Sequence, residues 1–262
     1  MKSKRAFSAI LQPRLFRGAV CAACLAAPSV VYGSDEADAF VAANLLATFY
    51  HELGHALIDL QNVQIYGQEE DAADVFAVFL IDALYEENDA QELMAHVARG
   101  FQAEAQELPD LASDRAWWDV HGQDEQRYFN SVCIFYGASP DAREDLSRQL
   151  ELPEERAETC PEEYDQANDA WGEILDEIWG AGEKTTVSLS ADSDAEETFS
   201  FDLIFQEVAF LNEQVALASD LDVVVEDCEE ANAFYDPELS LIIMCTELED
   251  YLFELFDVAH NQ

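Results

Sequence analysis

The sequence contains few basic residues. Lysine and arginine number 12 among 262 residues, against 56 aspartates and glutamates, and the formal net charge is −44 at pH 7. A surface with this excess of negative charge repels nucleic acid and anionic lipid, which excludes nucleic-acid binding as the function. Attraction of cations or basic substrates is one interpretation of the charge. We favour the other, a solvated surface suited to a salty exterior.

The sequence also lacks a run typical of a membrane span. The apolar run GAVCAACLAAPSVV near the N-terminus is shorter than the roughly 20 residues that a span needs, and it contains Pro28. It follows five basic residues and ends close to the small Gly33, a layout typical of a signal peptide. We therefore predict that residues 1–33 are a signal peptide cleaved near Gly33. The mature protein would be periplasmic or secreted, with no stable membrane span, and its 7 basic and 56 acidic residues give a formal charge of −49.

The mature chain has no C-x-x-C spacing, so a zinc site built from thiolates is not expected. Signal-peptide removal leaves four of the six cysteines, which are Cys133, Cys160, Cys228 and Cys245. An even number of cysteines in an exported protein indicates two disulfides, for which three connectivities are possible. We favour Cys133 with Cys160 and Cys228 with Cys245, because each pair lies within one segment.

The region from residue 34 to residue 180 has a helical pattern. Apolar residues recur mostly at four-residue steps in its first part, as at Phe49, Leu53 and Leu57. Further helices are predicted over residues 68–87, 90–108, 123–136 and 160–179. This region is therefore expected to form a helical core.

The composition changes after residue 180. Residues 181–200 are small, polar and acidic, which predicts a linker or exposed strands. Residues 201–262 begin with the helical pattern FDLIFQEVAFLNEQVALA, continue with a strand, LDVVVED, and a hairpin around the turn YDPE, and end with the short helix TELEDYLFELF. The sequence thus predicts an α+β fold that is mainly helical, with a small antiparallel sheet contributed by the C-terminal segment.

The stretch HELGH places two histidines four residues apart on the first predicted helix. Residues i and i+4 lie on one helix face, so His51 and His55 can offer two imidazole nitrogens to one ion. Glu52 can reach a water on that ion without binding the ion itself. Zinc with three protein ligands keeps its fourth position for water, so a third ligand is required.

The stretch EEDAAD offers the third ligand. Glu70 and Asp74 are four residues apart and share a face of the second helix. Glu70 can then bind the ion, while Asp74 accepts a hydrogen bond from the far nitrogen of one histidine. Glu69 could compete with Glu70, but the residue four positions beyond it is Ala73, which cannot accept that bond. We therefore favour Glu70 as the ligand and expect Glu69 to lie on the surface.

The combination of HELGH and EEDAAD resembles the gluzincin branch of the zincin metallopeptidases, in which two histidines and a glutamate bind zinc. The stretches HELGHALID, GQEEDAAD, WWDVHGQDEQRYFN, CPEEY and NAFYDPE resemble an uncharacterised bacterial family of zinc metallopeptidases, and the likeness covers most of the mature chain. It implies a zinc endopeptidase acting on peptide or protein substrates, which the predicted signal peptide would direct to export. It also implies zinc on His51, His55 and Glu70, with Glu52 as the general base and Asp74 as the residue that orients a histidine.

One feature departs from the zincin pattern. Zincins usually place a sheet before the metal-binding helix, and the edge strand of that sheet lines the cleft. Cleavage at Gly33 would leave only helical sequence before His51, and convincing strands occur only after residue 183. Our hypothesis is a permuted order, in which residues 221–245 fold back as the active-site sheet and one hairpin strand binds peptide by strand addition.

Hydrolysis also needs a group that stabilises the developing oxyanion. His121 is the leading candidate, followed by Tyr128 and Arg127, although a structural role for His121 is the alternative. His96 and His260 are expected on the surface. The alternative function is a non-catalytic acidic extracytoplasmic protein in which zinc has a structural role.

Overall fold

The computed structural model describes residues 36–65, 67–107, 118–179 and 185–260, and the predicted signal peptide, residues 1–33, lies outside them. Within this part of the chain the helices are α1 (Glu36–Leu60), α2 (Glu69–Leu84), α3 (Glu87–Glu107), α4 (Asp124–Ala138), α5 (Pro140–Gln149), α6 (Glu154–Ala157), α7 (Cys160–Ile178), α8 (Phe199–Gln214) and α9 (Glu247–His260). The strands are β1 (Val187–Ala191), β2 (Leu221–Glu226), β3 (Ala233–Asp236) and β4 (Leu241–Cys245). The predicted mainly helical α+β fold is confirmed.

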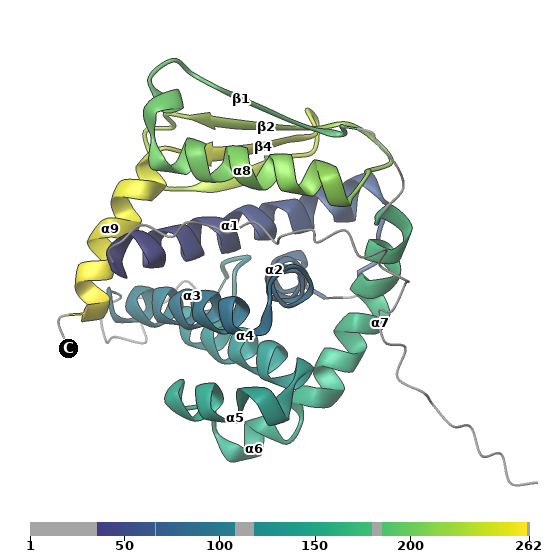
Figure 1. The fold of residues 1–262 in the computed structure, drawn as a ribbon, viewed down its shortest axis with the longest axis vertical. Coiled ribbons are helices and arrows are strands. Elements are labelled where there is room, and N and C mark those ends of the chain that lie inside the picture. The colour runs from purple at the N-terminus through teal and green to yellow at the C-terminus, as the bar shows by residue number, and fades with distance from the viewer. Residues whose placement is uncertain (1–35, 66, 108–117, 180–184, 261–262) are drawn as a thin grey trace, which may run out of the picture.

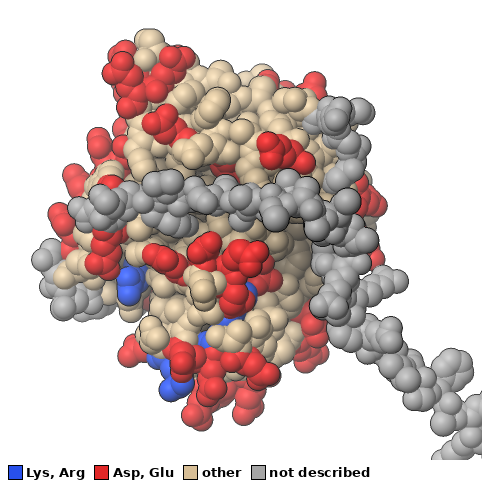
Figure 2. Space-filling model, viewed as in Figure 1, with Lys and Arg blue, Asp and Glu red and all other residues tan. Residues whose placement is uncertain are grey.

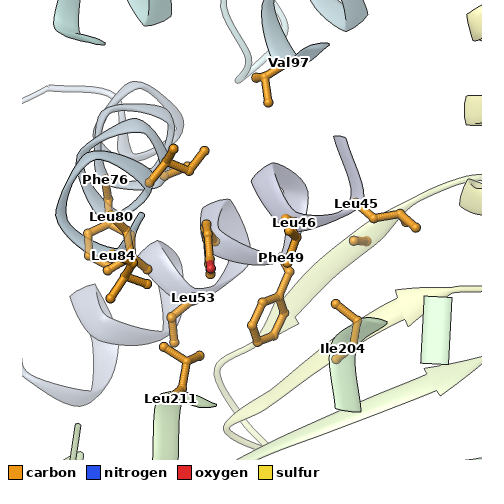
Figure 3. Close-up of a cluster of buried hydrophobic side chains, with 14 of the residues drawn as sticks. Leu45, Leu46, Phe49, Leu53, Phe76, Leu80, Leu84, Val97, Ile204 and Leu211 are labelled. Carbon is orange, nitrogen blue, oxygen red and sulfur yellow. The ribbon is translucent and has the colours of Figure 1, made fainter. Parts of the chain in front are cut away.

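Helix α1 runs through the centre of the molecule (Figure 1). Most of its 25 residues are buried, because apolar side chains occur on all its sides. In Figure 3, Leu53 faces Leu211 of α8, and Phe76 and Leu80 of α2 lie on another side of α1. Burial of polar groups is costly unless they have partners. The buried polar residues of α1, which are Asn44, His51 and Glu52, therefore mark the part of this helix where a function is to be sought.

The four strands form one mixed sheet in the order β1-β2-β4-β3. The hairpin of β3 and β4 is antiparallel as expected, but β1 pairs with β2 and β2 with β4 in parallel, so the prediction of an antiparallel sheet is wrong for two of the three strand pairs. For β1 and β2 the reason is that α8 connects them, and a helical crossover brings consecutive strands together in parallel. Strands β2 and β4 are parallel because β3, which comes between them in the chain, lies beyond β4 and runs antiparallel to it. Leu221, Val223 and Val225 of β2 are buried, whereas Asp222 is exposed and Val224 is half-buried. Only one face of the sheet is therefore packed against the core.

The packed face of the sheet lies against α1 and α8, and α9 covers one side of the molecule (Figure 1). Helices α2, α3 and α4 lie on the opposite side of α1 from the sheet. A polar contact in the core joins α8 to α1: the hydroxyl of Tyr50 donates to the carboxylate of Glu207 over 2.7 Å and lies 3.1 Å from the hydroxyl of Tyr85. The C-terminal segment is thus fixed to the helix that carries HELGH.

Two helices, one strand and one histidine differ from the sequence predictions. Helices α5 and α6 were not predicted. Within residues 181–200, for which a linker or exposed strands were predicted, residues 187–191 form an edge strand of the sheet. His96 was expected on the surface but is only 5% exposed, because α3 packs its ring against Phe40 of α1. A single polar residue in an amphipathic helix does not reveal how closely the neighbouring helix approaches.

Both disulfides favoured from the sequence are present, joining Cys133 to Cys160 and Cys228 to Cys245. Acidic side chains cover much of the face shown in Figure 2, whereas basic side chains are few. None of the described helices is long and apolar enough to cross a membrane.

Candidate metal centre

Three candidate ligand atoms meet where α1 and α2 cross. The Nε2 atoms of His51 and His55 are 3.1 Å apart, and Oε2 of Glu70 lies 3.1 Å from the first and 3.2 Å from the second. The ligand atoms of a tetrahedral zinc, each about 2.0–2.1 Å from the ion, lie roughly 3.3 Å from one another. The three residues thus have the spacing that such an ion requires.

The local sequence explains how the two helices come together. His51 and His55 are one helical turn apart on α1, and Glu70 lies in the first turn of α2. Gly54 lies between the histidines at the helix crossing, where an added Cβ would come within 3.1 Å of the Ala73 backbone. A larger residue at position 54 would separate the helices, so the glycine allows the carboxylate to reach both histidines.

A carboxylate lies at the outer nitrogen of each histidine. Oδ1 of Asp74 is 2.8 Å from Nδ1 of His51, and Oε1 of Glu69 is 2.9 Å from Nδ1 of His55. When both Nδ1 atoms donate, both Nε2 atoms have bare lone pairs directed at the same point, an arrangement that requires a cation between them. The donor set therefore fits a metal ion. Glu69 is exposed as expected, but its contact with His55 was missed, although its position beside Glu70 was a signal.

Arg127 of α4 holds the carboxylate of Asp74. Its Nε and Nη2 donate to the two oxygens of Asp74, each over 2.8 Å, and its guanidinium lies over the ring of Phe101 of α3. Burial raises the pKa of Asp74, but the bonds from Arg127 and His51 outweigh it and hold that pKa well below its usual range. The sequence indicated Arg127 only as an oxyanion candidate, because no spacing rule relates residue 127 to residue 74.

The electrostatics of the site favour a positive charge at its centre. Burial lowers the pKa of His51, yet the hydrogen bonds to Asp74 and Glu70 raise it to about 9. Hydrogen bonds from three imidazoles, first that of His121, hold the pKa of Glu70 far below its usual range. Burial raises the pKa of Glu52, which is 6% exposed. In this field a metal ion would replace the proton that the histidines otherwise bind.

His121 lies beside the candidate ligands. Its Nε2 donates to Oε2 of Glu70 over 3.0 Å, and Asp119 lies 3.3 Å from its Nδ1. Its ring stacks 6.0 Å from that of His51. Tyr128, by contrast, donates to the backbone oxygen of Leu150 in a separate buried cluster, so it was wrongly included among the oxyanion candidates.

A cleft of about 930 Å³ contains the candidate site. Helix α1 forms its floor, with residues from Asn44 to Asp59 lining it at three- and four-residue steps. Helices α2, α3 and α4 contribute one wall, and β3 with α9 the other. Glu52, Asp59 and Glu69 make part of this lining acidic.

Strand β3 forms the cleft wall opposite the EEDAAD helix. It is an edge strand among the described strands, and the hydroxyl of Tyr235 donates to Asp59 of α1 over 2.8 Å. The N–H of Cys245 donates to the carbonyl of Asn232, so these two opposed residues form a hydrogen-bonded pair. In an antiparallel ladder, hydrogen-bonded and non-hydrogen-bonded pairs alternate. The backbone N–H and C=O groups of Ala233 and Tyr235 therefore face away from β4. Strand β3 therefore lines the same cleft as His51.

The fold and the site define a mainly helical α+β protein with a helix-borne site suited to a metal ion. A family model described as "Putative metallopeptidase" matches residues 26–175 and 188–262, and the chain belongs to this family. No curated protein and no solved structure matches the chain. The family implies a metal ion and peptide substrates, in agreement with the resemblance seen in the sequence.

Proposed function

We propose that this protein is an exported, zinc-dependent metalloendopeptidase in which Glu52 is the general base. The observation that carries the proposal is the triangle formed by Nε2 of His51, Nε2 of His55 and Oε2 of Glu70, with Glu52 on the same helix face. Membership of a metallopeptidase family supports it. The two disulfides support an oxidising compartment and hence export.

His51, His55 and Glu70 would hold the metal ion. Two imidazole nitrogens and one carboxylate form the donor set that catalytic zinc takes in thermolysin, and three protein ligands leave a position open. Zinc, when bound there, supplies Lewis acidity toward a water molecule and a peptide carbonyl. The carboxylates of Asp74 and Glu69 keep the two imidazoles in the tautomer that presents Nε2 to the ion.

Glu52 would transfer the protons. It takes one from the attacking water and delivers it to the nitrogen of the departing amine. Its burial supports this role, because a carboxyl with a raised pKa accepts and returns a proton more readily than one that is fully solvated.

His121 would stabilise the developing oxyanion. It extends into the cleft next to Glu70, and Asp119 and Glu70 lie at its two ring nitrogens. The hydrogen bond to Glu70 raises the pKa of His121 and so favours the imidazolium form, in which the Nε2–H is a donor toward the substrate. This requires the Nε2–H of His121 to move from Glu70 to the substrate oxygen. The 46% exposure of the His121 side chain leaves room for such a movement.

The substrate would bind as an extra strand along β3. The backbone carbonyl of Ala233 and both backbone groups of Tyr235 face away from β4, and residues 231–235 line the cleft. Strand addition gives affinity through main-chain hydrogen bonds, so the enzyme would accept an extended peptide of varied sequence.

The test compares the zinc-loaded wild type with Glu52→Gln on a peptide library. We expect Glu52→Gln to bind one zinc per chain with unchanged affinity and to lose peptide cleavage by about 10²–10⁴-fold. Glu92→Gln, on the exposed side of α3, is the matched control and should cleave normally. Retained turnover in Glu52→Gln would refute the mechanism. Tight zinc binding without cleavage by the wild type would favour the non-catalytic alternative with a structural zinc.

A further inference from the structure

The Cys228–Cys245 disulfide lies where the chain enters the cleft wall. Cys228 is in the loop between β2 and β3, and Cys245 is the buried last residue of β4. The same loop contributes Ala231 and Asn232 to the cleft lining and leads directly into β3. The disulfide therefore joins the segment before β3 to the strand that β3 pairs with.

Hydrogen bonds fix the same segment at three further points. The backbone N–H of Cys228 is 3.1 Å from each carboxylate oxygen of Glu247, the first residue of α9. The backbone N–H of Cys245 donates to the carbonyl of Asn232 over 3.1 Å, and the backbone N–H of Thr246 donates to the carbonyl of Glu226 over 2.9 Å. These contacts define one anchor, made of the disulfide and Glu247, at the start of β3.

The loop needs an anchor because its own sequence opposes a compact conformation. Residues 226–230 read EDCEE, so four carboxylates flank a single cysteine. Like charges at this spacing repel one another. Glu229 also adopts a φ of 62°, in the left-handed region that non-glycine residues rarely occupy. The disulfide and the bonds to Glu247 hold the start of β3 against this repulsion.

We propose that the Cys228–Cys245 disulfide, with Glu247, positions the substrate-binding edge of the cleft and sets peptide affinity independently of the metal centre. The inference rests on the proposed function, because it takes β3 as the strand along which peptide binds. An edge strand that is ordered in advance loses less conformational entropy when a peptide adds to it, so loosening it raises KM. The candidate metal ligands lie on α1 and α2, and no residue of the anchor is among them.

The second disulfide provides an internal control. Cys133 and Cys160 are fully buried and join α4 to α7 in a cluster with Val132, Leu150 and Leu152. Neither cysteine lines the cleft. Removal of either disulfide lowers stability, so an effect that appears with only one of them is more than a general loss of stability.

The experiment compares the full mature, zinc-loaded wild type with the paired variants Cys228→Ser/Cys245→Ser and Cys133→Ser/Cys160→Ser. We expect the first pair to raise KM for a cleaved peptide by about tenfold, with kcat changed by less than about threefold and one zinc still bound. The second pair should lower the thermal unfolding midpoint and leave KM unchanged. Glu247→Ala, which keeps the disulfide, should raise KM by a smaller factor.

Amide hydrogen exchange gives a readout that needs no turnover. The first pair and Glu247→Ala should both accelerate exchange at residues 232–236, whereas the Cys133→Ser/Cys160→Ser pair should not. Unchanged exchange there, or equal KM shifts for the two disulfide pairs, would overturn the inference. Should the first pair fail to fold, Glu247→Ala decides by the same two measurements. Absence of cleavage by the wild type would instead count against the proposed function, and exchange would still test the anchor.

Discussion

The two walls of the cleft are built in different ways. The metal half takes its candidate ligands from residues 51–70, on two helices that are consecutive in the chain and packed together in the core. The opposite half is β3, residues 233–236, a short edge strand that reaches the site only because the C-terminal segment folds back on α1. The candidate metal ligands thus come from one short stretch of sequence, whereas the surface that would hold a peptide depends on contacts between residues distant in sequence.

The two halves also differ in how they are fixed. The histidines of the metal half are held by the carboxylates of Asp74 and Glu69, and Arg127 in turn holds Asp74. Both histidines lie on α1, most of whose residues are buried. Strand β3 is held on one side by β4 and at its ends by a disulfide and by the bond from Tyr235 to Asp59. Substitutions in the metal half should therefore alter metal affinity, and substitutions that loosen β3 should alter substrate affinity.

The largest effect should come from the adjacent glutamates of the metal half. Glu70→Gln removes a charged ligand and should weaken zinc binding by more than about a hundredfold, whereas Glu69→Gln removes a partner of His55 and should cost about tenfold. Competition with a chromophoric chelator measures both affinities. Equal losses in the two variants would mean that the carboxylates share the ligand role.

The contact of Glu207 on α8 with Tyr50 on α1 joins the C-terminal segment to the helix of the metal half, and its contribution to stability should depend on pH. Burial raises the pKa of Glu207 to about 7 from its ordinary 4.5, although the bonds from Tyr50 and Tyr85 lower it. The folded protein therefore holds this proton more tightly than the unfolded chain. The resulting stabilisation is complete below about pH 4.5 and is lost as the pH rises through about 7.

Glu207→Gln keeps the hydrogen-bonding shape without a titrating proton. Between pH 5 and pH 8 the wild type should lose roughly 3 kcal/mol more unfolding free energy than Glu207→Gln, as measured by urea denaturation. Glu213→Gln, at an exposed position of the same helix, is the control and should behave as the wild type. The same pH dependence in Glu207→Gln and the wild type would show that Glu207 does not titrate in the core.

A smaller effect is expected at Arg127, which acts on the metal only through Asp74. Arg127→Gln should weaken zinc binding by about tenfold, at the low end of the range for groups that orient a ligand. Arg99→Gln removes an exposed arginine whose ion pair with Glu36 is 3.8 Å long, and zinc affinity should not change. Isothermal titration with zinc distinguishes the two. An unchanged affinity in Arg127→Gln would remove Arg127 from the set of positioning residues.

The sequence predicted the long helices and the C-terminal hairpin well, because their apolar periodicity is strong. It predicted the parallel strands wrongly, since strand direction depends on how the segments between the strands pack, and not on the strand residues themselves. It missed the contacts of Arg127 with Asp74 and of Glu207 with Tyr50 for a related reason. Each joins residues far apart in the chain, and no local period relates them.

The sequence by itself determined which residues can form the metal triangle. The spacing of His51 and His55 places them on one helix face, and the spacing of Glu70 and Asp74 does the same on the next helix, through the geometry of the helix alone. Only the tertiary structure decided that Arg127 secures Asp74, that His121 lies beside Glu70, and that β3 closes the cleft. Those arrangements follow from the burial of whole helix and sheet faces, a property of the packed chain rather than of any short stretch of it.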